Sequence, residues 1–261
     1  MNQRWREGRT SYRPAGETIN PLRYEVGELT GDADAKAFVV GHHYSGTFPA
    51  ARSRWGLFRG GRLVGVAVFS HPCNDAVLTS VFGGAAVESM ELGRFVLLDD
   101  VEGNGETWFL ARCFEQLRRR ELRGVVSFSD PIARTTVDGV RVFPGHIGTI
   151  YQAHNARYLG RGTARSLRLL PDGQVLSDRA LQKIRSGERG WRYAAAHLER
   201  AGAATAPDDP ARRAHWLQGA LKTATRTLRH PGNHKYAWSL QRRHRIVLAG
   251  HPYPKGLATT A

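Results

Sequence analysis

Blocks of apolar residues alternate with polar turns through the first two thirds of the chain, and their spacing predicts strands and helices in turn. An apolar run at Phe95–Leu98 is followed by a Gly/Asn turn and by Thr107–Arg120, where apolar residues recur at helical spacing. A second apolar run follows at Val125–Phe128. Strand, helix and strand in this order predict a βαβ unit with a right-handed crossover and two parallel strands.

Further elements are predicted on both sides of this unit. Two β runs flank Gly60-Gly61, which predicts a hairpin. The segment Ala76–Phe82 is interpreted as a short strand or a loop. The other expected elements are a strand at 23–29, a helix at 32–40, hairpin strands at 55–58 and 63–69, a short strand at 140–143, a helix at 149–157 and a strand at 166–170.

The pattern becomes mostly helical from Ser177, a residue that favours a helix N-cap. Helices are predicted at 177–186, 189–201 and 211–228, and a last apolar segment follows a loop at 230–238. The first residues are polar and contain Pro and Gly. We therefore expect a flexible arm at 1–21, a catalytic core at 22–173 and a basic, mostly helical extension at 174–261.

Charge separates the two halves of the chain. The net charge is +15, yet residues 1–156 carry 18 basic and 17 acidic side chains, whereas residues 157–261 carry 20 basic and 6 acidic ones. This asymmetry favours a polyanionic partner such as nucleic acid; a solubilising surface or a genomic preference for arginine is the alternative. The two cysteines and the lack of an apolar run near the ~18 residues of a membrane span predict a cytoplasmic protein without membrane contact.

Polar residues follow both strands of the predicted βαβ unit. Asp99 and Asp100 follow the first strand, the Asn104-Gly105 turn precedes the helix, and Ser129 and Asp130 follow the second strand. Ligands of parallel sheets bind at the carboxyl ends of the strands, so we expect the functional site at this edge.

Six short motifs resemble the phage Mom family of DNA-modification proteins and, more broadly, the GNAT acyltransferase fold. The motifs occur in order over roughly residues 23–240: His42-His43-Tyr44-Ser45, Glu91-Leu92-Gly93-Arg94-Phe95, Asn104-Gly105-Glu106-Thr107-Trp108, Ser127-Phe128-Ser129-Asp130-Pro131, Gly145-His146-Ile147-Gly148-Thr149-Ile150-Tyr151-Gln152-Ala153 and Gly232-Asn233-His234-Lys235-Tyr236. The resemblance implies a mixed, strongly twisted sheet flanked by helices. It also implies conversion of adenine in double-stranded DNA to an N6-(methylcarbamoyl) form, which protects phage DNA from host restriction.

Three residues are the candidates for catalysis. Asp130, at a strand end, could accept a proton from the adenine amine or hold that amine, with Ser129 orienting it. Tyr151 occupies the position from which the resemblance implies a tyrosine that protonates a departing thiolate. The structural alternatives are that Asp130 caps the turn before Pro131 and that Tyr151 packs in the core.

The resemblance implies an acyl-CoA-type donor, with acetyl-CoA or a related compound as the candidate. Glycines in the loop before the central helix would let backbone N–H groups approach a phosphate, although its acidic residues would repel one. Arg94 could hold a phosphate or pair with Glu91. The candidate donor-binding residues are Arg94, Asn104, Gly105, Glu106 and Thr107.

Iron is a further candidate ligand. Imidazole, phenolate and carboxylate groups suit iron, and the proposed set is His43, Tyr44, Asp130 and Tyr151, with His42 as an alternative. A solvated loop at 42–44 is the structural alternative.

DNA contact is predicted on the basic C-terminal part, where guanidinium and ammonium groups could bind phosphates. The candidates are Lys183, Arg185, Arg189, Arg192, Arg226, Arg229, Lys235, Tyr236, Arg242 and Arg243. Two other functions are kept open: a GNAT-type N-acetyltransferase of a small amine or protein, and a non-catalytic nucleic-acid-binding protein.

Overall fold

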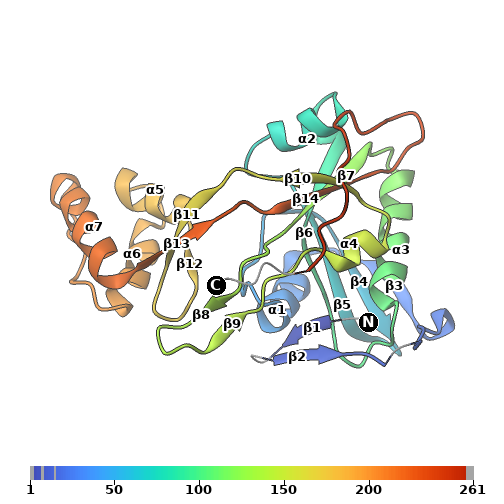
Figure 1. Cartoon of the computed structure of the whole chain (residues 1–261), viewed down its shortest axis with the longest axis horizontal. Coiled ribbons are helices and arrows are strands. Elements are labelled where there is room, and N and C mark those ends of the chain that lie inside the picture. Colours follow the sequence, from blue (N-terminus) through green and yellow to red (C-terminus); the bar gives the residue numbers. More distant parts are fainter. Residues whose placement is uncertain (1–2, 7–8, 15, 257–261) are drawn as a thin grey trace. The chain divides into compact units, whose positions relative to one another are not determined.

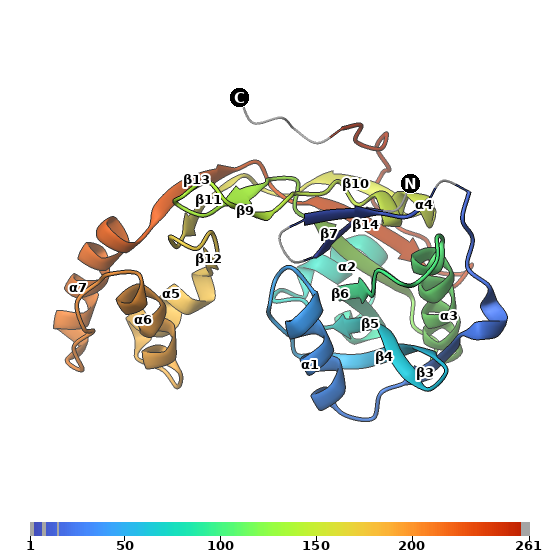
Figure 2. The same ribbon diagram turned by 90° about the horizontal axis from the view of Figure 1, so that it is seen from below.

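A seven-stranded mixed sheet forms the first of two units in the computed structural model, which describes residues 3–6, 9–14 and 16–256 (Figures 1 and 2). This unit takes its described residues from 1–131, 146–162 and 233–261; the second comprises 132–145 and 163–232. The strand order is β10-β14-β7-β6-β5-β4-β3. The strands are β3 (Glu25–Glu28), β4 (Ala51–Arg59), β5 (Arg62–Ser70), β6 (Ser89–Leu97), β7 (Gly124–Ser129), β10 (Arg157–Arg161) and β14 (His234–Ser239).

The predicted βαβ unit and hairpin are both confirmed. β6 and β7 are parallel, every other neighbouring pair of the sheet is antiparallel, and α3 (Gly105–Arg119) connects the two parallel strands. The hairpin turn has φ of 56° at Gly60 and 76° at Gly61, which only glycine adopts at low cost. The fold class is therefore a mixed α/β sheet flanked by helices, as predicted.

The two parallel strands separate partway along their length. They pair only from Ser89–Gly124 to Glu91–Val126, although β6 continues to Leu97 and β7 to Ser129. Where they part, the Ser127 hydroxyl donates to the Leu92 carbonyl at 3.0 Å.

Helices cover both faces of this sheet. α3 buries Phe109, Leu110, Cys113, Phe114 and Leu117, which recur at helical spacing and join the main hydrophobic core. The other helices of this unit are α1 (Asp32–His42), α2 (Ala76–Phe82), α4 (Thr149–Ala153) and the 3-10 turns η1 (Pro21–Arg23) and η2 (Ala86–Glu88). β1 (Gln3–Arg6) and β2 (Arg9–Tyr12) form a separate antiparallel pair.

Three predicted elements differ from the observed ones. Residues 76–82 form helix α2, because Leu78, Val81 and Phe82 share one helical face and are buried. The helix predicted at 149–157 ends at Ala153, since 157–161 pair with β14 instead. The helix predicted to reach residue 228 ends at Ala224.

The second unit combines a small sheet with three helices. Residues 226–230 form β13 beside β11, and the extended Thr225 and the β-branched Thr227 suit that strand. Ser177 caps α5 as predicted, accepting from the Ala180 N–H at 3.1 Å. The elements are β8 (Arg134–Thr135), β9 (Arg141–Phe143), β11 (Arg165–Leu169), β12 (Val175–Leu176), β13 (Arg226–His230), α5 (Asp178–Ser186), α6 (Trp191–Arg200) and α7 (Pro210–Ala224).

The structural division differs from the contiguous boundary expected at residue 173. Residues 234–239 enter the main sheet as β14, between β10 and β7, so the chain returns to the first unit after the helices. The helices α5, α6 and α7 have their own hydrophobic core, which includes Ile184, Leu198 and Leu217. No helix of the described chain is long and apolar enough to cross a membrane.

Candidate active site

Polar side chains from four separate stretches of the chain gather where β6 and β7 part. The Tyr44 hydroxyl lies 3.2 Å from His146 Nε2, and the rings of His43 and Tyr44 lie 4.1 Å apart. The loop that carries His146 is tied to the end of β7, because the His146 N–H donates to the Asp130 carbonyl at 2.8 Å. We call the following residues the polar cluster: His43, Tyr44, Glu91, Arg94, Ser127, His146 and Tyr151.

Arg94 is the cation of this cluster. Its Nε donates to the Thr47 carbonyl at 2.9 Å and its Nη2 to the Thr47 hydroxyl at 2.7 Å, which fixes the guanidinium. Burial lowers the pKa of Arg94, while Tyr44, Glu91 and Tyr151 oppose that change. The side chain therefore places a positive charge among the other cluster members.

Glu91 is a carboxyl group in the middle of a mostly apolar strand. Burial raises its pKa, and the nearby Arg94 and His71 partly offset this rise. A carboxyl group with a raised pKa is a stronger base than an ordinary one, so Glu91 is a candidate proton acceptor. From sequence alone, Glu91 is expected only to pair with Arg94. The available signal was its position inside the apolar strand.

His43 is held as a neutral imidazole. Burial, together with Arg94 and His146, lowers its pKa to about 3. The Ser45 N–H donates to His43 Nδ1 at 3.1 Å, and this amide can only be a donor. The proton of neutral His43 therefore resides on Nε2, which makes Nε2 a donor.

The expected iron set does not fit this arrangement. A metal-binding Nε2 needs a lone pair, which would move the proton to Nδ1 and oppose the Ser45 N–H. His42 packs against Phe38 instead, with ring centroids 4.7 Å apart. Across the described residues, no group of three or more His, Cys, Asp and Glu side chains is placed to hold a metal ion.

Tyr151 lies in the first turn of α4 and is hydrogen-bonded to Ser127. Burial raises its pKa, so it keeps its proton at neutral pH. The preceding Gly148 has φ of 74°, and an added Cβ would lie 2.7 Å from the Tyr236 ring and 2.8 Å from the Tyr151 ring. Glycine at this position lets Tyr151 pack between Gly148 and the sheet.

Ser129 ends β7 beside a buried histidine, and Asp130 follows it. His234 lies opposite Ser129 in the antiparallel pair, and His234 Nδ1 is 2.7 Å from the Tyr158 hydroxyl. The Ser129 hydroxyl and His234 Nε2 are buried and have no hydrogen-bond partner among the described residues. Burial lowers the pKa of His234. These two polar groups can each make a further hydrogen bond at the predicted site edge.

The loop before α3 does not form an open phosphate cradle. The Gly103 N–H already donates to the Glu17 carboxylate at 2.7 Å, and a Cβ on Gly103 would lie 2.3 Å from the Glu17 carbonyl oxygen. Glu106 is buried in an ion pair with Arg4 at 2.7 Å. Of the other predicted donor-binding residues, Asn104 is exposed, Gly105 is buried, Thr107 is half-buried, and only Arg94 belongs to the polar cluster.

Arginines of the protein neutralise two acidic residues of this loop, Asp100 and Glu102. Asp100 pairs with Arg59 and, at 3.2 Å, with Arg62. Glu102 pairs with Arg23 at 3.0 Å and is hydrogen-bonded to Tyr24. Their carboxylates therefore serve the fold rather than a ligand.

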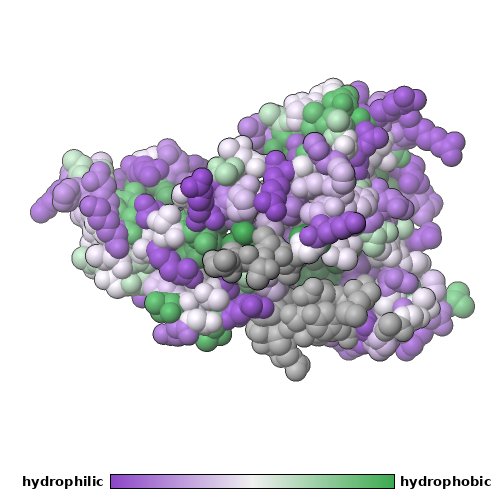
Figure 3. Space-filling view, in the orientation of Figure 1, coloured by the Kyte–Doolittle hydropathy of each residue, from purple (hydrophilic) through white to green (hydrophobic). Residues whose placement is uncertain are grey.

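The predicted DNA-contact residues are divided between the two units. The second unit contains Lys183, Arg185, Arg189, Arg192, Arg226 and Arg229; the first contains Lys235, Tyr236, Arg242 and Arg243. The second unit carries 15 Lys and Arg residues against 7 Asp and Glu residues, and hydrophilic residues are interspersed with hydrophobic ones over its helices in Figure 3.

The predicted DNA-contact residues differ in how free their side chains are to contact DNA. Arg192 pairs with Asp208, and Arg226 donates to the Thr135 carbonyl at 2.5 Å. Tyr236 does not fit a base-stacking role, because it is 0% exposed and its hydroxyl donates to the Ile147 carbonyl. Lys235 is half-buried, and burial lowers its pKa.

Fold and site together define a mixed α/β protein with a polar site between two separating parallel strands. The family model described as the Mom protein family matches residues 23–255, and the chain belongs to that family. The match includes all members of the polar cluster. No curated protein matches the chain.

Several solved structures are similar to the chain. An N-acetyltransferase from Staphylococcus aureus Mu50 is 10% identical, with a TM-score of 0.36 over 84% of this chain and 99% of that one. A Bacillus subtilis acetyltransferase in complex with CoA is 9% identical, with a TM-score of 0.33 over 84% and 99%. A tandem GNAT protein from the clavulanic acid biosynthesis pathway is 10% identical, with a TM-score of 0.36 over 90% and 81%.

Proposed function

We propose that the chain is a transferase that modifies the N6 amine of adenine in double-stranded DNA, giving an N6-(methylcarbamoyl)adenine-type base that protects phage DNA. Membership of the Mom protein family supports this proposal. The observation that carries it is the convergence of four motifs on the polar cluster, through His43-Tyr44, Glu91 to Arg94, Ser127 to Asp130, and His146 to Tyr151.

The cluster contains the groups that such a transfer needs. The adenine amine is a weak nucleophile, so a base must take its proton as the new N–C bond forms. Asp130 is the base predicted from sequence, and Glu91 is a second candidate because burial raises its pKa. Arg94 would stabilise negative charge on the attacked carbonyl oxygen. Tyr151 keeps its proton at neutral pH and would give it to the leaving group.

The donor in this proposal is an activated acyl compound of the acyl-CoA type. The loop before α3 is not free to hold its diphosphate, since Glu17 and Arg4 already use that loop. The phosphate-bearing part of such a donor would therefore bind elsewhere on the protein.

The DNA partner is supported by charge. The excess of Lys and Arg lies in residues 157–261, and polyanions bind to such surfaces through phosphate contacts. An adenine in a duplex is shielded from the cluster, so the target base must be flipped out of the stack.

Nucleoside mass spectrometry tests the proposal. DNA from a bacterial host that makes the parent protein should contain a new adenosine species, and its mass identifies the transferred group. Glu91→Gln, Asp130→Ala and Tyr151→Phe should each reduce that species, whereas Arg112→Ala, on the exposed face of α3, should not. Unmodified DNA, together with thiol release from acetyl-CoA on adding a small amine, would support the N-acetyltransferase instead.

A further inference from the structure

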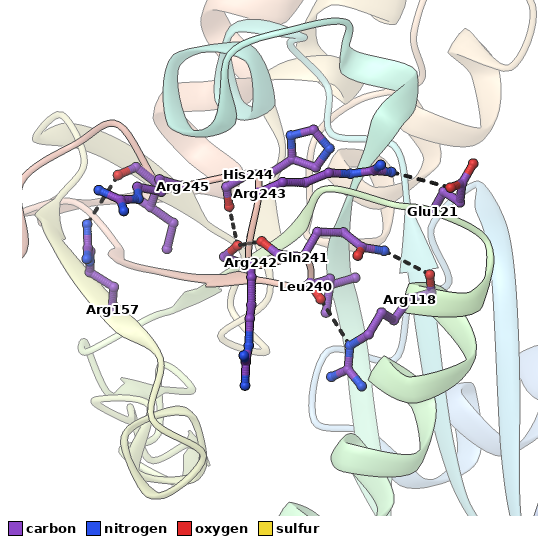
Figure 4. A pocket seen from close by; sticks show the side chains of 11 residues that line it. Arg118, Glu121, Arg157, Leu240, Gln241, Arg242, Arg243, His244 and Arg245 are labelled. Atoms are coloured by element: carbon purple, nitrogen blue, oxygen red, sulfur yellow. Dashed lines mark hydrogen bonds and ion pairs between the residues drawn. The ribbon is translucent and has the colours of Figure 1, made fainter.

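A basic groove with a volume of about 1360 Å³ lies beside the segment that follows β14 (Figure 4). Residues 239–246 form one wall. Arg118 and Glu121, at the end of α3, and Arg157, at the start of β10, complete the lining. All of these residues belong to the first unit.

The groove and the candidate active site lie at opposite ends of the main sheet. β14 runs antiparallel to β7, with Ser239 opposite Gly124 and His234 opposite Ser129. The groove begins at Ser239, whereas the polar cluster extends from Ser127, opposite Tyr236, to the loop that follows Ser129. Ser127 lies three positions and Ser129 five positions from Gly124, so the two sites are about 10–17 Å apart along the strand at ~3.3 Å per residue.

The groove carries five arginines and His244 against a single carboxylate, Glu121. Within the part of the chain that the structure describes, Glu121 pairs only with Arg243, at 3.3 Å, and both side chains are exposed, so the pair contributes little. Most of the positive charge in the groove is therefore not neutralised by the protein.

Backbone carbonyls hold two of the arginines without neutralising them. Arg118 Nε donates to the Leu240 carbonyl at 3.0 Å, and Arg157 Nη1 donates to the Ile246 carbonyl at 3.2 Å. Arg242 and Arg245 are exposed, and neither guanidinium has a hydrogen-bond or ion-pair partner in the described chain. Two guanidiniums are thus fixed in place and two are free to bind an anion.

We infer that this groove binds the phosphate backbone of duplex DNA at a distance from the base that is modified. The inference rests on the proposed function for the identity of the polyanion. None of the described lining residues is Phe, Tyr or Trp, so the His244 imidazole is the one aromatic ring that these residues offer to a base, and the lining favours phosphate contacts over base stacking. Arginine binds phosphate bidentately, and such contacts add affinity without sequence preference.

The position of the groove sets where the contact falls on DNA. A separation of about 10–17 Å corresponds to about three to five base pairs at ~3.4 Å per base pair. The groove would therefore bind the phosphate backbone several base pairs away from the adenine that is modified. The polar cluster would remain free to bind the flipped adenine.

Salt-dependent DNA binding tests the inference. The affinity for a fluorescein-labelled duplex of about two helical turns is measured by anisotropy at several salt concentrations between about 50 and 200 mM. The variant R242A/R245A removes two phosphate contacts, so the slope of log affinity against log salt should become shallower by about 1.8. At about 0.1 M salt this corresponds to a loss of about 60-fold in affinity.

The matched control is R23A/R62A, which removes the same charge from two exposed arginines near β3 and β5. Its slope should equal that of the parent. An unchanged slope in R242A/R245A, or an equal change of slope in the control, overturns the inference that the groove binds DNA. Neither result contradicts the proposed function. If the parent itself binds no duplex at about 50 mM salt, the DNA partner and the proposed function fail with it.

Discussion

A buried ion pair between Arg4 and Glu106 ties the amino-terminal segment to the start of α3. Arg4 Nε donates to Glu106 Oε1 at 2.7 Å, and Nη1 donates to the carbonyls of Leu98 at 2.7 Å and Val101 at 2.9 Å. The side chains of the pair are only 8% and 5% exposed. Arg4→Met would remove this cation from the buried carboxylate and the donor from both carbonyls.

Loss of one partner from a buried ion pair costs about 3–5 kcal/mol, so Arg4→Met should lower the free energy of unfolding by that amount. The measurement is urea unfolding followed by tryptophan fluorescence. With a slope of about 3 kcal/mol per molar urea, the midpoint should fall by about 1–2 M. The double variant R4M/E106M should recover much of the loss, because apolar residues of similar volume can replace a buried pair at little cost.

Arg13→Met is the matched control for this experiment. Arg13 also pairs with a carboxylate, that of Glu17, but these side chains are 27% and 22% exposed. The expected loss is below about 1 kcal/mol. If Arg4→Met lies within about 1 kcal/mol of the parent, or the double variant is no more stable than Arg4→Met, the ion pair does not anchor the segment.

Three further predictions concern the polar cluster. Burial raises the pKa of Glu91, so kcat/KM should rise with pH through a pKa above the usual glutamate range, and Glu91→Gln should abolish that limb. Gly148→Ala should lower DNA modification at least about tenfold, because the added Cβ would displace the Tyr151 ring. The free energy of unfolding should fall by only about 1–3 kcal/mol, because the φ of residue 148 disfavours alanine. Adenosine analysis measures the first effect and thermal unfolding the second. The pKa of His43 falls to about 3 on folding, so the unfolded chain binds the proton first, and stability should fall as pH drops from about 6.5 towards 3. His43→Asn should remove that part of the acid sensitivity; a parallel decline in both proteins would contradict it.

Local patterns predict most elements of the main sheet because each depends on neighbouring residues. The hairpin follows from Gly60-Gly61 between two β runs, and α3 follows from apolar residues at helical spacing. The prediction errors arise where pairing with a distant strand decides the secondary structure. Thr225 to Leu228 continue a helical pattern in sequence, yet they are extended in the structure because β11 offers a strand partner. The return of β14 to the middle of the sheet likewise depends on β7, more than 100 residues away.

The sequence identifies single candidate residues of the site, but it does not show which of them the fold brings together. Motif residues such as His43, Arg94 and Tyr151 are visible one by one in the sequence, and the fold brings them together. Glu91 and His146 gained their candidate roles only from that proximity. A charge in an apolar strand signals a buried carboxyl group, but its raised pKa depends on which groups surround it.

The glycine-rich turn before α3 shows that a sequence motif does not identify the group that contacts it. Glycine at 103 signals that something approaches the backbone closely, and both a ligand phosphate and a chain segment meet that requirement. In this protein the Glu17 carboxylate, 86 positions away, accepts from the Gly103 N–H. A carboxylate thus occupies the place that an anionic ligand would take, so a phosphate could bind there only by displacing Glu17 and, with it, the pairing of Glu17 with Arg13.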